Sequence, residues 1–158
     1  MKAFIEIQAG GGIKYEVNEK TGELEVDRFL YTSFVYPFNY GYIQGTTGED
    51  GDPLDVVLLS QLPIQPGATI EINAIGLLEM EDEEGIDNKI IAVPMEKIDP
   101  EFGAIIDINE VPKPTLAKIK HFFEHYKALE PDKWVKVRAF KGKTYADAEI
   151  GKAGGRTA

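Results

Sequence analysis

Three aspartates crowd the start of an apolar segment, in the run Asp50-Gly51-Asp52-Pro53-Leu54-Asp55. Like charges this close repel one another unless they share a proton or a cation neutralises them. A hard divalent cation such as Mg²⁺ takes oxygen ligands and keeps several waters, which leaves positions where phosphate oxygens can bind. These aspartates therefore predict a metal site of the kind used in phosphate chemistry.

Other interpretations of this run explain less of it. A calcium-binding EF-hand needs an oxygen ligand at its fifth position, Gly at its sixth and Glu at its twelfth, where this chain has Leu54, Asp55 and Gln61. Phosphatases with an aspartyl nucleophile carry their D-x-D motif after an apolar strand, whereas here the apolar strand follows the acids. A solvated Asp-Gly turn accounts for Asp50 and Gly51 but leaves Asp55 without a partner at the start of a buried strand.

A second acidic cluster spans residues 79–89, between two predicted strands. Taken alone, such a cluster is more often a solvated hairpin. Lys89 stands two positions beyond Asp87, and strand alternation places both side chains on one face. Together with Asp82, they could hold a metal and a phosphate at the same place.

An aromatic run over residues 29–42 is mostly expected in the core. Its hydroxyl groups on Tyr36, Tyr40 and Tyr42 need partners when buried, and an oxyanion is one possible partner. Arg28 directly follows Asp27 just before this run, and Lys14 and Glu16 share one face of their predicted strand. Surface salt bridges are the alternative interpretation of both pairs.

A predicted helix over residues 115–129 places His121 and His125 four positions apart on one face. The pair lacks the Glu of the H-E-x-x-H zinc signature, so an interface or core role is favoured for both. Tyr126 and Lys127, near the C-terminus of this helix, could offer a hydroxyl and an ammonium to phosphate.

These residues must be positioned by a mainly β fold with flanking helices. Hydrophobic patterning predicts seven strands, of which the first three suggest a β-meander: 3–8, 13–17, 23–29, 54–60, 69–80, 89–94 and 134–140. The helix over 115–129 has a clear apolar face, and a weaker helix is expected over 145–153. So many short strands predict a closed or partly closed barrel.

The composition of the 158-residue, 17.5 kDa chain predicts a single domain, 1–158, whose tail frays at about 154–158. The absence of cysteine removes disulfides and thiolate metal sites. A net charge of −10 disfavours a nucleic-acid partner. The longest apolar run, residues 56–59, is too short to span a bilayer, and the N-terminus lacks a signal-peptide pattern, so we expect no membrane partner and a cytoplasmic location.

Six ordered blocks, which extend from Ile5 to about Val137, resemble the family I soluble inorganic pyrophosphatases in their small prokaryotic form. The blocks are residues 13–16, 26–29, 36–42, 50–56, 82–89 and 121–127, and D-G-D-P-x-D is the family signature. The resemblance implies an OB-like, five-stranded closed β-barrel. It also implies Mg²⁺-dependent hydrolysis of inorganic diphosphate to two phosphates, with roughly two to four ions in the active site.

The resemblance also implies a role for each matching residue. Asp52 is the expected general base, which takes a proton from a metal-bridging water that attacks in line, without a covalent intermediate. The expected metal ligands are Asp50, Asp55, Asp82, Asp87 and Glu16. The expected substrate-binding residues are Lys14, Arg28, Tyr40, Lys89, Tyr126 and Lys127, with Glu6 and Tyr36 in the outer shell.

Two features differ from many relatives: the loop at Gly10–Gly12 lacks a proline, and Ala128 replaces an acid near the two histidines. A homohexamer with His121 and His125 near a subunit interface is expected. The rival classes are a non-catalytic OB-type binding module, which would carry a basic groove, and a Mg²⁺ or Ca²⁺ buffer, which would not need bases beside its acids.

Overall fold

The structure, a computed structural model, describes residues 1–155 as a mainly β fold with two α-helices. The strands in this range are β1 (Lys2–Ile7), β2 (Ile13–Val17), β3 (Leu24–Phe29), β4 (Asn39–Ile43), β5 (Asp55–Leu58), β6 (Thr69–Asp82), β7 (Gly85–Ile86), β8 (Lys89–Pro94) and β9 (Val135–Gly142). The helices are α1 (Lys113–His125) and α2 (Lys143–Lys152), with short 3₁₀ turns at Phe102–Ala104 and Ile108–Glu110.

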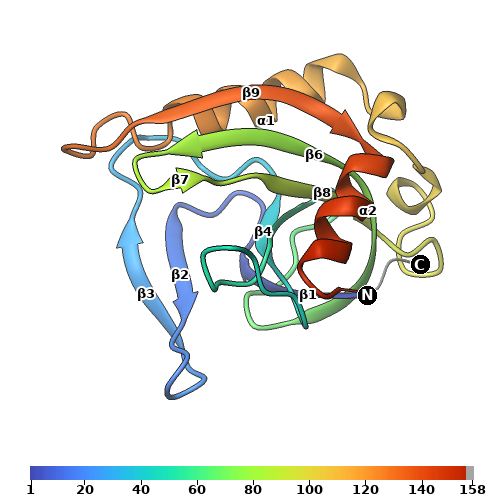
Figure 1. Cartoon of the computed structure of the whole chain (residues 1–158), viewed down its shortest axis with the longest axis horizontal. Coiled ribbons are helices and arrows are strands. Elements are labelled where there is room, and N and C mark those ends of the chain that lie inside the picture. The colour runs from blue at the N-terminus through green and yellow to red at the C-terminus, as the bar shows by residue number, and fades with distance from the viewer. Residues whose placement is uncertain (156–158) are drawn as a thin grey trace.

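Five strands close into a ring in the order β1-β4-β5-β8-β6, because β6 also pairs with β1. The β5–β8 pair is parallel, whereas the other pairs of the ring are antiparallel. The long β6 continues past the ring to pair with β7 and β9 (Figure 1). The predicted class, mainly β with flanking helices around an OB-like five-stranded barrel, is confirmed.

Buried side chains of the ring point alternately into two cores. On β5, Val56 and Leu58 belong to a core that also contains Ala146 and Ile150 of α2. The intervening Val57 belongs to the second core, which is packed against the aromatic face of α1. Because both faces of β5 are covered, its sequence is continuously apolar rather than alternating.

The prediction that the first three strands form a meander is wrong. Strands β2 and β3 pair with each other in a separate two-stranded sheet, and β1 instead pairs with β4 on one edge and β6 on the other. Because both edges of β1 are taken, β2 has no free edge to join. The β2–β3 hairpin therefore extends away from the barrel, as Figure 1 shows.

Strand β4 was not predicted, because Tyr40-Gly41-Tyr42 lacks the apolar alternation of a strand. Gly41 has a packing role here, since a Cβ at this position would lie 1.9 Å from the carbonyl oxygen of Phe4 on β1. The ends of the other predicted strands differ from the structure by no more than two residues.

Helix α1 begins at Lys113, with Pro114 in its first turn, and ends at His125. The predicted extension to residue 129 is wrong, because residues 126–129 form turns. The backbone N–H of Ala128 donates to the carbonyl of His125 at 2.9 Å. Within this turn, Lys127 forms a buried ion pair with Asp82.

Helix α2 was predicted over 145–153 and begins two residues earlier. The backbone N–H of Gly155 donates to the carbonyl of Ile150 at 2.9 Å, just past the end of this helix. Of the tail expected to fray, residues 156–158 lie outside the described residues. Within the described chain, neither helix is long and apolar enough to cross a membrane.

Candidate active site

A cavity of about 850 Å³ lies beside the barrel and is lined by both strands of the β2–β3 hairpin. Its lining includes every residue that the sequence assigned to a site. These residues are Glu6, Lys14, Glu16, Arg28, Tyr36, Tyr40, Asp50, Asp52, Asp55, Asp82, Asp87, Lys89, Tyr126 and Lys127. Acidic and basic groups from distant parts of the chain thus face one space.

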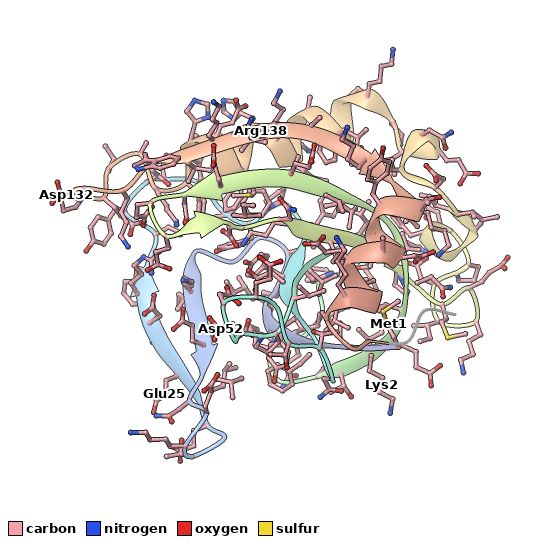
Figure 2. All side chains as sticks on the ribbon, in the orientation of Figure 1. Met1, Lys2, Glu25, Asp52, Asp132 and Arg138 are labelled. Atoms are coloured by element: carbon pink, nitrogen blue, oxygen red, sulfur yellow. The ribbon has the colours of Figure 1, made fainter. Side chains whose placement is uncertain are left out.

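The loop before β5 presents the aspartates of the D-G-D-P-L-D motif. Gly51 adopts a φ of +88°, which suits glycine in a tight turn, and the backbone N–H of Asp52 donates to Asp50 Oδ1 at 3.0 Å. The expected Asp-Gly turn is therefore present, and it holds its two acids close together. Asp55 follows as the first residue of β5. Asp52 is exposed on this loop, where Figure 2 labels it.

Lys89 is a buried cation shared by two carboxylates. Its side chain is only 2% exposed, and its Nζ lies 2.7 Å from both Asp55 Oδ2 and Asp87 Oδ1. Burial by itself lowers the pKa of Lys89, but Asp55, Tyr40 and Asp87 raise it well above its ordinary value. Burial raises the pKa of Asp87, and Lys89 offsets part of that rise. The predicted alignment of Asp87 and Lys89 is thereby confirmed.

The donor chemistry of the cavity fits Mg²⁺, because the candidate ligands are all carboxylates. Lys89 contacts one oxygen of Asp55 and one of Asp87, so the second oxygen of each is available to an ion. In residues 1–155 no group of three or more His, Asp or Glu side chains is already gathered around a metal position. Lys89 is a further cation that contacts both Asp55 and Asp87.

A second buried ion pair joins Asp82, the last residue of β6, to Lys127 after α1. Lys127 Nζ donates to Asp82 Oδ2 at 3.0 Å. Burial favours a higher pKa for Asp82, but hydrogen bonds from the Glu84 backbone N–H and from Lys127 lower it below its ordinary value. Asp82 is therefore ionised at neutral pH and holds Lys127 at the edge of the cavity.

The β2–β3 hairpin contributes a chain of charged contacts. Lys14 Nζ lies 2.9 Å from Glu16 Oε1 and 3.8 Å from Asp27 Oδ2, and Asp27 also contacts the Arg28 guanidinium. Arg28 Nε lies 3.0 Å from Glu130 Oε1. The salt bridges considered as an alternative are therefore present, but they line the cavity rather than an isolated surface.

Aromatic hydroxyls form another part of the wall. Tyr36 is 2% exposed and Tyr40 is 8% exposed. Burial, above all, raises the pKa of both phenols well above the ordinary value, so both keep their protons as hydrogen-bond donors. The ammonium of Lys89 lies 5.4 Å from the centre of the Tyr40 ring, within the range of a cation–π contact.

Two further acids have altered acidity in the absence of bound cations. Burial, followed by the charge of Asp55, raises the pKa of Glu6 to about 7, and Glu6 Oε2 accepts a hydrogen bond from the Val17 backbone N–H at 3.3 Å. Desolvation and then the neighbouring Asp50 raise the pKa of Asp52. Cations in the cavity would oppose these carboxylate repulsions.

His121 and His125 are exposed on α1 and do not line this cavity. Their rings are 4.3 Å apart between centroids, and Phe34 meets both rings edge-on. The core alternative for this pair is wrong, and the interface role stays a prediction.

The structure adds acids and bases that sequence reasoning did not assign to the site. Glu130 contacts Arg28, and Lys133 Nζ lies 3.1 Å from Glu83 Oε1 at the edge of the cavity. Glu130 lies in the segment after α1, and the basic residues at helical spacing from it are Lys127 and Lys133, so the sequence does not point to Arg28. Only the tertiary fold brings it to β3.

Comparison with known proteins places the chain in one family. The family model described as inorganic pyrophosphatase matches residues 3–157. An inorganic pyrophosphatase of Aquifex pyrophilus is 53% identical over 148 residues, which are 94% of this chain and 84% of the relative. The corresponding protein of Sulfolobus acidocaldarius is 52% identical over 95% of this chain and 87% of its own length.

Solved structures agree with the sequence comparisons. An inorganic pyrophosphatase from Helicobacter pylori superposes with a TM-score of 0.94 at 48% identity, over 97% of this chain and 90% of that one. The Thermus thermophilus enzyme gives a TM-score of 0.93 at 42% identity, over 97% of this chain and 88% of that one. Fold, cavity and sequence thus lead to the same conclusion: the chain belongs to the inorganic pyrophosphatase family.

Proposed function

We propose that this chain hydrolyses inorganic diphosphate to two phosphates in a Mg²⁺-dependent reaction. The observation that carries the proposal is the convergence of carboxylates and bases on one cavity in a member of this family. A metal buffer would not need Lys14, Arg28 and Lys89 beside its acids. A nucleic-acid-binding module would not suit a net charge of −10.

Mg²⁺ would be held by Asp50, Asp55 and Asp87, with Asp82 and Glu16 as ligands of additional ions. When bound, the cations would neutralise phosphate charge and lower the pKa of a nearby water. The proposed number of ions, roughly two to four, comes from the family resemblance. Glu6 and Tyr36 would support these groups from the outer shell.

Asp52 would act as the general base that accepts the proton of the attacking water. It is exposed to the cavity, and the hydrogen bond from its backbone to Asp50 places it beside the expected ligands. Its pKa is raised by desolvation and by Asp50, which increases its basicity. Water would attack phosphorus in line, without a covalent intermediate.

The basic and hydroxyl groups would bind the phosphate oxygens. Arg28 offers a planar fork, whereas Lys14, Lys89 and Lys127 act as point charges. Tyr40 and Tyr126 are buried residues that line the cavity, and their hydroxyls would donate to phosphate oxygens. Positioning and charge stabilisation of the transferred group would supply most of the rate enhancement.

The decisive experiment measures phosphate release by the purified protein from diphosphate with Mg²⁺, with EDTA and with neither. Release that requires both diphosphate and Mg²⁺ is expected, and its absence would remove the proposed activity. Asp55→Asn should abolish most of this release, because it removes a carboxylate that is expected to bind Mg²⁺. The matched control is Glu124→Gln, an exposed acid on α1 outside the cavity, which should stay fully active.

The homohexamer and the cytoplasmic location expected from the sequence stay predictions. The exposed His121–His125 pair is available on the surface of α1, which is compatible with a subunit contact. Sedimentation of the wild type and of a His121→Gln, His125→Gln variant would test that contact.

A further inference from the structure

Glu130 is a buried carboxylate in the segment between α1 and β9. Its side chain is 6% exposed, and its Oε1 lies 3.0 Å from Arg28 Nε. Its second oxygen, Oε2, and the Arg28 Nε atom are both buried, and neither has a hydrogen-bond partner within residues 1–155, so the contact is an ion pair without a hydrogen bond. The Arg28 guanidinium is therefore the charged group that compensates this carboxylate.

A buried carboxylate with an oxygen that lacks a hydrogen-bond partner lowers the stability of the folded protein. Desolvation of an ionised group is unfavourable, and the attraction of one cation offsets this cost only when the geometry is good. Buried polar atoms that lack a partner are rare, so each one calls for an explanation. A retained but incompletely satisfied Glu130 indicates a role in placing Arg28.

The two carboxylates around Arg28 hold different nitrogens of its guanidinium. Glu130 contacts Nε, and Asp27 contacts Nη1. Because the guanidinium is planar, fixing these two nitrogens also fixes the direction of the third. Among the described residues Nη2 donates no hydrogen bond, so it can meet an anion in the cavity that Arg28 lines.

The Arg28–Glu130 contact also joins two parts of the fold. Arg28 lies on β3 of the hairpin outside the barrel, whereas Glu130 lies beyond the C-terminal end of α1 (Figure 1). The ion pairs of Lys14 stay within the hairpin, at Glu16 and Asp27. Among the described ion pairs, Arg28–Glu130 is the one that ties the hairpin to the body of the protein.

We propose that Glu130 is a positioning residue for phosphate binding: it holds the Arg28 guanidinium so that Nη2 faces the bound anion. The proposal rests on the proposed function, since it names a residue that shapes the same site. Glu130 acts through Arg28 and not on the substrate, because it does not line the cavity.

Positioning and simple electrostatics predict opposite effects of removing Glu130. If only charge mattered, loss of a carboxylate near the anion would strengthen phosphate binding. If Glu130 positions Arg28, its loss weakens binding, because the guanidinium gains rotamers that point its N–H groups away from the anion.

A third alternative is that Glu130 only stabilises the turn that carries Tyr126 and Lys127. That alternative predicts a loss of binding that does not depend on Arg28.

The test is a double-mutant cycle on binding of imidodiphosphate with Mg²⁺, measured by calorimetry. Glu130→Ala should weaken binding about tenfold, and it should change binding less than about twofold in the Arg28→Ala background. Glu130→Gln keeps the size of the side chain but removes the charge of the ion pair, so it should weaken binding nearly as much as Glu130→Ala. Glu130→Asp keeps the charge but is one methylene shorter, so it should lose nearly as much as Glu130→Ala.

The Asp and Gln variants keep the test valid if Glu130→Ala does not fold. Tighter binding by either Glu130→Ala or Glu130→Gln would overturn the proposal in favour of electrostatics. An equal loss with and without Arg28 would overturn it in favour of a structural role for the turn. Glu124→Ala, an exposed acid at the end of α1, is the matched control and should leave affinity unchanged.

Phosphate release from diphosphate by the wild type is measured in the same series. A wild type that is active, combined with an additive cycle, removes only the role of Glu130. A wild type that neither binds the analogue nor releases phosphate removes the proposed function, and the role of Glu130 with it.

Discussion

The ammonium of Lys89 lies 2.7 Å from a carboxylate oxygen of Asp55 and 2.7 Å from a carboxylate oxygen of Asp87. A buried lysine thus neutralises two carboxylates that are also expected to bind Mg²⁺. Because Lys89 uses one oxygen of each, the cation of the protein and the cation from solution can share these ligands. Lys89 already neutralises part of the negative charge of these carboxylates, and bound Mg²⁺ would neutralise more of it.

Lys89→Met should destabilise the protein strongly when Mg²⁺ is absent. Breaking a buried ion pair from one side leaves carboxylates uncompensated, which typically costs about 3–5 kcal/mol in the free energy of unfolding. The pKa of Lys89 is raised, so its stabilising effect is fully present below its ordinary pKa of 10.5, and pH 7 lies within that range. Urea unfolding at pH 7 in EDTA would measure the loss.

Mg²⁺ should restore part of the stability of Lys89→Met, because ions that bind only the folded state stabilise it by mass action. The gain on adding Mg²⁺ should exceed the gain for the wild type. Equal gains for the two proteins would contradict a shared set of ligands. Lys97→Met, which removes an exposed lysine paired with Glu71, is the matched control and should change stability by less than about 1 kcal/mol.

Glu6 should make the metal-free protein less stable as pH rises from about 4.5 to about 7. Its pKa in the folded state is about 7, raised from 4.5, so the unfolded chain loses this proton at lower pH than the folded one. Stability linked to Glu6 is therefore fully present below pH 4.5 and is lost as pH rises through about 7. The difference between the two pKa values corresponds to at most about 3–4 kcal/mol.

Glu6→Gln removes this ionisation and keeps an oxygen that can accept from the Val17 backbone N–H. In EDTA the variant should be more stable than the wild type at pH 8 and equally stable near pH 4.5. Thermal unfolding at several pH values would show whether the two curves separate in this direction. A constant difference at every pH would assign the effect to packing instead of ionisation.

Parts of the fold that depend on local pattern could be predicted from the sequence. The apolar run at Val56–Leu59 predicted β5, and the two-residue spacing of Asp87 and Lys89 predicted their shared face. Tyr40-Gly41-Tyr42 gave no strand signal, because Gly41 is selected by the approach of β1 and not by strand propensity. The prediction of a meander was wrong because the hydrophobic pattern identifies strands but does not show which strand edges remain free for pairing.

In the candidate site, too, local motifs could be predicted from the sequence, whereas contacts between distant segments could not. The D-G-D-P-L-D motif and the family resemblance brought together residues that the fold places around one cavity. The partner of Arg28 could not be predicted, since no local rule relates Glu130 to a residue on β3. Similarly, the apolar pattern favours continuation of the helix to residue 129, and it does not indicate that Lys127 pairs with the distant Asp82.

Gly41→Ala should destabilise the barrel. A Cβ at this position would lie 1.9 Å from the carbonyl oxygen of Phe4, so β1 and β4 would have to separate. Overpacking of this kind costs typically about 1–3 kcal/mol, and the rigid backbone on both sides favours the upper end. Urea unfolding followed by circular dichroism would measure it.

Gly151→Ala provides a control of opposite sign. Gly151 is exposed in α2, and a Cβ there would meet nothing within 4 Å. Alanine in a helix is favoured over glycine by up to about 1 kcal/mol, so this variant should be as stable as the wild type or more so. Equal destabilisation by both changes would show that Gly41 has no special packing role.

Asp52→Asn should separate catalysis from metal binding. Asp52 is proposed as the base, so its loss should reduce turnover of diphosphate by about 10²–10⁴-fold while Mg²⁺ affinity changes little. The base must be ionised, and its pKa is raised, so wild-type turnover should fall as pH drops through the acidic range. Calorimetry of Mg²⁺ binding and phosphate release between pH 5 and pH 9 would test both statements. A variant that binds Mg²⁺ poorly but turns over normally at high Mg²⁺ would make Asp52 a ligand. The amide cannot accept the proton, whereas Asp50 beside it would still hold its ion, and this difference makes the two roles separable.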